Sequence, residues 1–446
     1  MAESTCGNGT CRPACIQSAQ RKGRTARTRR KQSASQKFHS LSHQSSYVNL
    51  FTWLKRKFDC RFKNLVVVDF PDTGRGLMTT VSLSPGNKII SLPIEALVTT
   101  ETVLASTAGQ FIKRYRPKLT AQEALCVFLM YERHLGKASE WMPYINLLPE
   151  SFSTPGYFSE SELLSLPQNA KEKTREHLKT LDKSYKNVRH FFYECWEEMQ
   201  PFLSRSDFLW SWYAVNTRSV YLELPPSSHL QAQDQCMALA PVLDLLNHSP
   251  YTQVKAGLNK SKSHFEIITY GCYKPYEQVF IAYGAHDNVK LFSEYGFTVP
   301  RNPNNVFQFS KEHLKALLTT FDVSNLPEKS TCIREAQLKC LTANEDGLSW
   351  KLVTFLRIVS MTWDELQNWK VALQGNPVSM QNEELVKKMA MWLMKRAMDE
   401  NQSTSKGDDC SLRIHQQLVK SLHEDELHIL QVCQGLQMSG EEEDAG

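Results

Sequence analysis

Two features that mark membrane and secreted proteins are missing from this sequence. It contains no uninterrupted apolar run of about 18 residues or more, so it predicts no membrane span. The opening residues, Met-Ala-Glu-Ser-Thr-Cys, lack the apolar core of a secretory signal peptide. We therefore expect a protein of the cytosol or nucleus with no membrane partner.

Paired metal-binding cysteines are missing as well. The 12 cysteines are scattered, and the body of the chain contains no Cys-X-X-Cys or Cys-X-Cys pair. Cys6, Cys11 and Cys15 lie close together, but no histidine nearby completes a zinc site. We expect reduced thiols and no bound metal.

Positive charge is concentrated at the N-terminus. Residues 1–45 carry nine Lys or Arg and one acidic residue, Glu3, whereas the other 43 Lys or Arg are opposed by 46 Asp or Glu. This segment has few large apolar residues, which predicts a disordered tail. Its basic cluster at 21–31 suits nuclear import or contact with nucleic acid, and a solvated polar tail is an equal alternative.

The first ordered region is expected to be rich in β-strands. A short helix over 47–54 precedes a strand at 64–70, a turn at Gly74-Arg75-Gly76 and further strands up to 88–93. The turn does not fit a dinucleotide fingerprint, because a third glycine is missing and a strand follows it. Alone it predicts only a tight turn or a close backbone approach.

The middle of the chain is expected to be helical, and helices return after residue 300 up to about 435. Thr120 and Glu123 form a capping-box pattern, and Gly136 ends that helix. A helix over 206–221, capped by Ser206 or Asp207, carries Thr217-Arg218 among apolar neighbours. A buried arginine needs a carboxylate, which belongs either to the protein or to a ligand.

A second β-rich region, 236–297, carries the most informative residues. The apolar run 237–246 contains Asp244 and ends in Asn247-His248-Ser249-Pro250. A buried carboxylate needs a partner, and a cationic small molecule would supply one. A second apolar run ends at Tyr283-Gly284. The alternatives are a histidine satisfied by backbone groups and a tyrosine of the core.

Taken together, six motifs in this order and spacing resemble one family. They are Gly-Arg-Gly-Leu at 74–77, Trp-X-Pro-Tyr at 141–144, Thr-Arg at 217–218, Asp-Leu-Leu-Asn-His-Ser at 244–249, Tyr-Gly at 283–284 and Glu-Tyr-Gly-Phe at 294–297. The chain resembles, over about 48–435, the SET-domain methyltransferases of the Rubisco large-subunit methyltransferase subfamily.

That resemblance implies an α+β fold with a β-rich, pseudoknotted SET domain split by a helical insert and followed by an all-α substrate-binding domain. The expected division is a disordered basic tail at 1–45, SET segments at 46–115 and 223–299 around an insert at 116–222, a helical domain at 300–436 and an acidic tail at 437–446.

The resemblance also implies roles for single residues with S-adenosylmethionine as cofactor. Backbone at Gly74, Arg75 and Gly76 is expected to meet the cofactor, Arg218 its carboxylate, Asn247 its amino-acid end and His248 its adenine. Asp244 is expected to orient this loop. Tyr283 matches the catalytic tyrosine, while Tyr295 and Phe297 line the cofactor site and the channel for the target side chain.

The activity so implied is protein-lysine N-methylation of histone tails or other proteins, in the nucleus and cytoplasm. The substrate protein is expected in a groove between the SET and C-terminal domains, and nucleic acid at most on the basic tail. The alternatives are histidine methylation and a catalytically silent binding module. Because each required position is filled, the sequence favours an enzyme.

Overall fold

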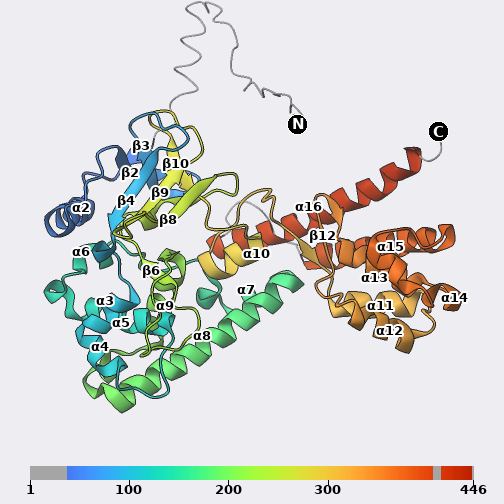
Figure 1. The fold of residues 1–446 in the computed structure, drawn as a ribbon, viewed down its shortest axis with the longest axis horizontal. Coiled ribbons are helices and arrows are strands. Elements are labelled where there is room, and N and C mark those ends of the chain that lie inside the picture. The colour runs from blue at the N-terminus through green and yellow to red at the C-terminus, as the bar shows by residue number, and fades with distance from the viewer. Residues whose placement is uncertain (1–37, 405–412, 444–446) are drawn as a thin grey trace, which may run out of the picture.

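The computed structural model describes residues 38–404 and 413–443, which form two lobes joined by a long C-terminal helix (Figure 1). The basic cluster at 21–31 and the first three cysteines lie outside the described residues. The described chain opens with strand β1 (His39–Ser40) and helix α2 (Ser45–Phe58). No helix within the described ranges is long and apolar enough to cross a bilayer.

A five-stranded sheet carries the site residues, in the order β1, β2 (Leu65–Phe70), β3 (Gly74–Thr79), β10 (Gln278–Ile281) and β7 (Asn247–His248). The turn expected at Gly74–Gly76 lies earlier, because Gly74 already pairs with Phe70 as the first residue of β3. Its φ of +66° is open to glycine and costly for other residues.

Strand β7 runs parallel to β10, with Asn247 opposite Phe280 and His248 opposite Ile281. This pairing brings two motifs that lie 35 residues apart to one end of the sheet. Strand β4 (Lys88–Pro93) belongs to a separate three-stranded sheet with β9 (His264–Thr269) and β8 (Val254–Leu258). A two-stranded sheet joins β5 (Ser219–Tyr221) to β6 (Met237–Leu239).

Between β4 and β5 in the sequence the chain is mostly helical, and these helices lie below the sheets in Figure 1. The capping box of Thr120 and Glu123 and the stop at Gly136 are confirmed. Besides α2, two further helices precede the start of the insert expected at residue 116. The helices are α3 (Thr100–Ala105), α4 (Thr107–Ile112), α5 (Ala121–Leu135), α6 (Met142–Ile145), α7 (Glu160–Leu164), α8 (Gln168–Cys195) and α9 (Arg205–Arg218).

Helix α9 differs from its prediction at both ends. Its N-cap is Ser204 rather than Ser206 or Asp207, because the Ser204 hydroxyl accepts a hydrogen bond from the Asp207 N–H at 3.0 Å. At the other end the helix stops at Arg218, and the next three residues form β5. Arg218 is therefore the last residue of the helix and directly precedes strand β5.

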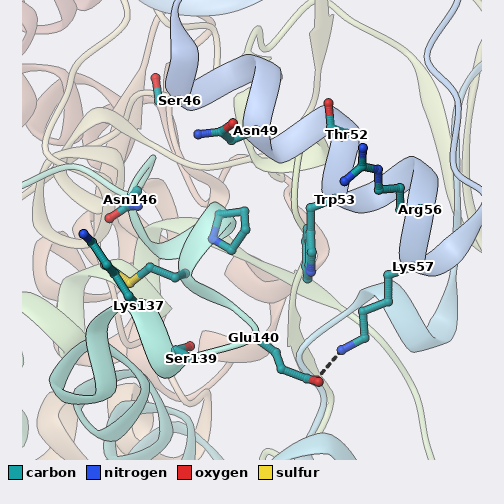
Figure 2. Close-up of a pocket in the computed structure, with 12 residues that line it drawn as sticks. Ser46, Asn49, Thr52, Trp53, Arg56, Lys57, Lys137, Ser139, Glu140 and Asn146 are labelled. Carbon is teal, nitrogen blue, oxygen red and sulfur yellow. Dashed lines mark hydrogen bonds and ion pairs between the residues drawn. The ribbon is translucent and has the colours of Figure 1, made fainter.

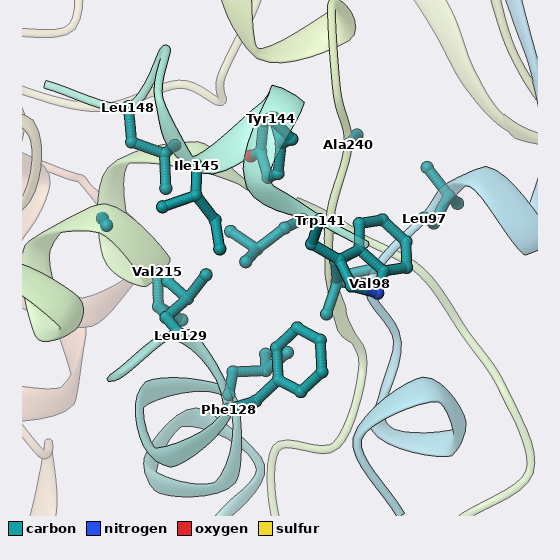
Figure 3. Packing of buried hydrophobic residues seen from close by; sticks show 14 of the residues in the cluster. Leu97, Val98, Phe128, Leu129, Trp141, Tyr144, Ile145, Leu148, Val215 and Ala240 are labelled. Atoms are coloured by element: carbon teal, nitrogen blue, oxygen red, sulfur yellow. The ribbon is translucent and has the colours of Figure 1, made fainter. Parts of the chain in front are cut away.

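The main core lies where the helical insert meets the sheets. Phe128 and Leu129 from α5, Trp141 and Ile145 from the two ends of α6, and Val215 from α9 pack together in Figure 3. Each is less than a tenth exposed, and burial of a side chain of this size contributes about 1.5–3 kcal/mol. This packing fixes the ends of α6 and α9, which face the site.

The C-terminal lobe is mostly helical but not entirely, which corrects the all-α expectation. A three-stranded sheet joins β11 (Phe307–Gln308), β12 (Thr342–Asn344) and β13 (Gly347–Leu348). Around it pack α11 (Lys311–Thr320), α12 (Leu326–Glu335), α13 (Trp350–Ser360), α14 (Trp363–Leu366), α15 (Met380–Thr404) and α16 (Ile414–Glu443). The acidic end, expected as a tail from 437, is helical up to Glu443.

Helix α16 ties the two lobes together. Its Leu418, Val419 and Leu422 share an apolar cluster with Leu166 of the insert and Phe292 of the last site segment. Polar contacts reinforce this connection. The Asn288 amide, at the start of α10 (Asn288–Lys290), donates hydrogen bonds to Asp425 of α16 and to the carbonyl oxygen of Val299.

Candidate functional site

Four aromatic residues from three chain segments meet at the end of the five-stranded sheet. The Tyr283 ring lies 5.2 Å from His248, 5.1 Å from Tyr295 and 6.3 Å from Phe297, measured between centroids. His248 and Phe297 are 6.1 Å apart. The structure thus brings together residues that the sequence placed in separate motifs.

The Tyr283 hydroxyl is held in a fixed position. It donates a hydrogen bond of 2.8 Å to the backbone carbonyl oxygen of Leu246. Burial raises the pKa of Tyr283 to about 12, although the Arg218 guanidinium opposes that shift. The phenol therefore stays protonated at neutral pH, with its oxygen lone pairs free to face a neighbouring group.

His248 is a buried, neutral imidazole. Burial lowers its pKa to about 4, and the charge of His286 adds to this effect. Its Nδ1 accepts a hydrogen bond from the backbone N–H of Tyr283 at 3.1 Å, so the ring proton must be on Nε2. That Nε2–H has no hydrogen-bond partner among the described residues.

Asp244 and Arg218, which the sequence did not pair with each other, lie in contact but form no ion pair. The guanidinium Nη1 donates to the backbone carbonyl oxygen of Asp244 at 2.6 Å. The Asp244 carboxyl accepts a hydrogen bond from the Tyr144 hydroxyl at 3.0 Å. Burial raises the pKa of Asp244, while Arg218 and Tyr144 act in the opposite direction. Asp244 thereby joins the insert to the loop that precedes Asn247.

Asn247 and the glycine strand form a close backbone contact. The Asn247 amide donates to the carbonyl oxygen of Arg75 at 3.0 Å and to that of Thr73 at 3.4 Å. A Cβ on Gly76 would lie 2.8 Å from the Asn247 amide nitrogen, so a larger residue there would push the Asn247 side chain away. The Arg75 side chain turns to the carbonyl oxygen of Leu147 at 2.8 Å.

A cavity of about 190 Å³ opens beside Tyr283. Its wall includes aliphatic and aromatic side chains from four strands and the Leu243–Leu245 turn, while Arg218, Asp244, two hydroxyl residues and three tyrosines supply polar groups. The apolar part of the wall consists of Val220, Leu243, Leu246, Ala256, Phe265, Ile267, Ile281 and Ala282. The cavity is therefore a channel whose wall is mainly apolar and includes the Tyr283 phenol.

Two features of the site were not assigned from sequence. Tyr144 was noted only as part of the Trp-X-Pro-Tyr motif, although its hydroxyl holds Asp244. Val242 has φ of +71°, a costly conformation for a β-branched residue, directly before the 3₁₀ turn Leu243–Leu245. The Trp-X-Pro-Tyr motif could have drawn attention to Tyr144. A single valine in a sequence does not indicate that its backbone has a positive φ.

The site fits a ligand that carries both charged and hydrogen-bonding groups. Among the described residues, Arg218 Nε, Ser219 Oγ and His248 Nε2 are buried without a hydrogen-bond partner. Buried polar atoms of this kind are rare unless a ligand or water satisfies them. A carboxylate and a purine, both present in S-adenosylmethionine, would satisfy a guanidinium and an imidazole N–H.

Comparison of the sequence with known proteins identifies several relatives of this chain. The sequence model of the family "Rubisco LSMT substrate-binding" matches residues 311–438. SET domain-containing protein 4 of Mus musculus is 37% identical over 92% of this chain and 96% of its own length. Actin-histidine N-methyltransferase of Danio rerio is 25% identical over 82% of this chain and 64% of its own.

The fold matches a solved structure over nearly its whole length. The crystal structure of the SET domain of LSMT bound to lysine and AdoHcy aligns with a TM-score of 0.63 at 19% identity. The alignment covers 90% of this chain and 93% of that one. The expected α+β fold with a helical C-terminal lobe is confirmed at this level.

Proposed function

Because this chain belongs to the S-adenosylmethionine-dependent SET-domain methyltransferases of the Rubisco large-subunit methyltransferase type, we propose that it methylates lysine side chains of proteins. The observation that carries this proposal is the channel beside Tyr283. Its apolar wall suits the four-carbon stem of lysine, and we place the end of that stem beside the Tyr283 hydroxyl.

The residues of the site are suited to hold the cofactor as the sequence suggests. We assign its carboxylate to Arg218, its amino-acid end to Asn247, and its adenine to the neighbourhood of His248 and Phe297. Gly76 lets the strand backbone come close. When bound, S-adenosylmethionine supplies an electrophilic methyl group, and the protein's main contribution is alignment of the acceptor with it.

Loss of the acceptor's proton is the second requirement. A free lysine has a pKa of about 10.4, so it is almost fully charged at neutral pH. Removal from water favours the neutral amine, and the apolar wall of the channel provides such an environment. Tyr283 keeps its own proton, and the Asp244 carboxyl is held by Tyr144. The proton therefore leaves to water before transfer.

Histidine is the alternative acceptor, because an actin-histidine methyltransferase is among the relatives. An imidazole must keep one nitrogen protonated and hydrogen-bonded while the other reacts. No amide side chain is among the residues that line the described channel. The apolar wall thus favours lysine over histidine.

We assign the substrate protein, a histone tail or another protein, to a groove between the SET region and the C-terminal lobe. We place the enzyme in the nucleus and cytoplasm. We expect contact with nucleic acid at most through the N-terminal tail.

The test uses the purified full-length chain with tritiated S-adenosylmethionine and a cell extract, with Tyr283→Phe beside wild type. We expect a labelled protein band that yields methyl-lysine after acid hydrolysis and falls about 100-fold or more in the variant. Tyr251→Phe is the matched control, because Tyr251 is 70% exposed and its hydroxyl bonds to the Arg301 carbonyl.

Other outcomes would change the proposal. Methyl-histidine in the hydrolysate would make the chain a histidine methyltransferase. Cofactor binding by calorimetry with no label on any protein would support a silent binding module. Equal loss in both tyrosine variants would remove Tyr283 from its catalytic role.

A further inference from the structure

A second, larger recess lies outside the methyl-transfer site. It is a cleft of about 590 Å³ between helix α2 and the segment that leads into α6. Figure 2 shows Trp53, Arg56 and Lys57 on the α2 wall, with Lys137 and Asn146 on the opposite wall. None of the residues assigned to the cofactor lines this cleft.

The cleft is positively charged. Arg56 and Lys137 are exposed on opposite walls, and neither forms an ion pair with a described residue. Lys57 is paired with Glu140 at 2.5 Å, but that carboxylate-bearing side chain is 77% exposed. Exposed pairs contribute about 0–1 kcal/mol, so an incoming carboxylate can replace Glu140.

The cleft also has an apolar floor. Trp53, Met142 and Pro143 line it, and the Trp53 ring packs on Trp141 at 5.4 Å between centroids. Trp141 is buried and belongs to the main core. A rigid aromatic floor with basic rims is the arrangement by which interfaces anchor an apolar side chain between charges.

We infer that this cleft binds an acidic segment of a partner protein, with carboxylates on Arg56 and Lys137 and an apolar side chain over Trp53. Charge complementarity favours this occupant. Nucleic acid suits the cleft less, because few cations line it and Glu140 adds negative charge. The chain's own acidic end does not reach it, because α16 ends at the opposite side of the molecule from α2 (Figure 1).

The cleft backs onto the methyl-transfer site through α6. Met142, Pro143 and Asn146 face the cleft. Between and beside them, Tyr144 holds the Asp244 carboxyl, and the Leu147 carbonyl oxygen holds Arg75. A segment that presses on this one-turn helix therefore acts on both contacts. Binding of the acidic segment is therefore coupled to binding of the cofactor, and each changes the affinity for the other by the same factor.

Binding is tested by fluorescence anisotropy with a labelled glutamate-rich peptide containing one central leucine, at low salt. We expect Arg56→Glu to weaken binding about tenfold or more. Lys55→Glu makes the same charge change on the neighbouring residue, which does not line the cleft, and should weaken it less than about threefold. Added salt should weaken binding, because surface charges are screened.

Equal loss in the two variants, or equal binding of the glutamine counterpart of the peptide, would overturn the inference. So would tighter binding of a single-stranded oligonucleotide that is lost in Arg56→Glu, which would make the cleft a nucleic-acid site. Unchanged thermal melting of both variants shows that they fold.

The coupling has its own measurement. Titration of cofactor by calorimetry, with and without saturating glutamate peptide, should show at least a threefold change in Kd. An unchanged Kd would overturn the coupling through α6. Because peptide binding requires no methyl transfer and should persist in Tyr283→Phe, its failure is separable from failure of the lysine proposal.

Discussion

The backbone N–H of Tyr283 donates a hydrogen bond to Nδ1 of His248, with 3.1 Å between the two nitrogens. This bond requires an unprotonated Nδ1, so it holds only while the imidazole is neutral. It joins Tyr283, two residues beyond the end of β10, to His248, the last residue of β7, and both residues belong to the aromatic cluster. The geometry of the site is thereby linked to the charge of one histidine.

Acid should destabilise the protein through His248. Its pKa is about 4 in the folded chain and about 6.5 when unfolded, so the unfolded state binds a proton first as pH falls. The stability that the neutral ring contributes is present above pH 6.5 and is lost as pH falls towards 4.

We expect protonation at this one group to lower the free energy of unfolding by up to about 2 kcal/mol between pH 7 and 5, measured by denaturant unfolding. His248→Gln should lose less stability than wild type over the same interval. His43→Gln, at an exposed position, should behave as wild type. An identical pH dependence in all three proteins would contradict this account.

Arg218→Lys should weaken cofactor binding by about tenfold or more. A lysine has no planar fork to donate to the Asp244 carbonyl oxygen and a carboxylate together. Calorimetry of cofactor binding measures the effect. Arg205→Lys is the control, because Arg205 forms an ion pair with Asp182 in which both side chains are more than half exposed. Similar Kd values for the two variants would remove Arg218 from the cofactor site.

Gly76→Ala should destabilise the fold by about 1–3 kcal/mol and weaken cofactor binding together. The added methyl would lie 2.7 Å from Gln278 Nε2 and 2.8 Å from Asn247 Nδ2, so Asn247 must move. Gly435→Ala is the counterpart, because nothing lies within 4 Å of its added Cβ in α16. It should stabilise the protein by about 0.5–1 kcal/mol. Thermal melting measures whether each variant is less or more stable than wild type.

Glu426→Gln should stabilise the lobe junction at high pH. Burial raises the pKa of Glu426 to about 7, and Asn169 and Asn401 only partly offset this by donating to its carboxylate. Because the folded-state pKa exceeds the unfolded value, the stability linked to this group is present below about pH 4.5 and lost as pH rises through 7.

The variant should therefore exceed wild type by up to about 3 kcal/mol at pH 8 and match it near pH 4. Denaturant unfolding at both values measures the difference. Glu424→Gln, exposed on the same helix, should show no such pH-dependent gain. A gain that is equal at the two pH values would contradict a titrating Glu426.

Features encoded by neighbouring residues were predictable from the sequence. The capping box of Thr120 and Glu123 is one example, because both partners lie within one turn. Contacts between distant residues were not. Asp244 clearly needed a partner, but Tyr144 lies 100 residues earlier, and no local pattern pairs the two. The strands of the C-terminal lobe are only two or three residues long, too short for alternation to show.

The contact of α16 with Phe292 has a consequence for how the enzyme is made. Phe292 lies in the π-helical turn Leu291–Tyr295 that delivers Tyr295 to the channel, and it packs on the first turns of α16. A ribosome synthesises that turn more than 100 residues before the helix that covers it. The nascent chain therefore holds every motif of the site while the surface of Phe292 is still uncovered, and we expect the turn that carries Tyr295 to reach its final packing only once the C-terminal helix has folded back onto it.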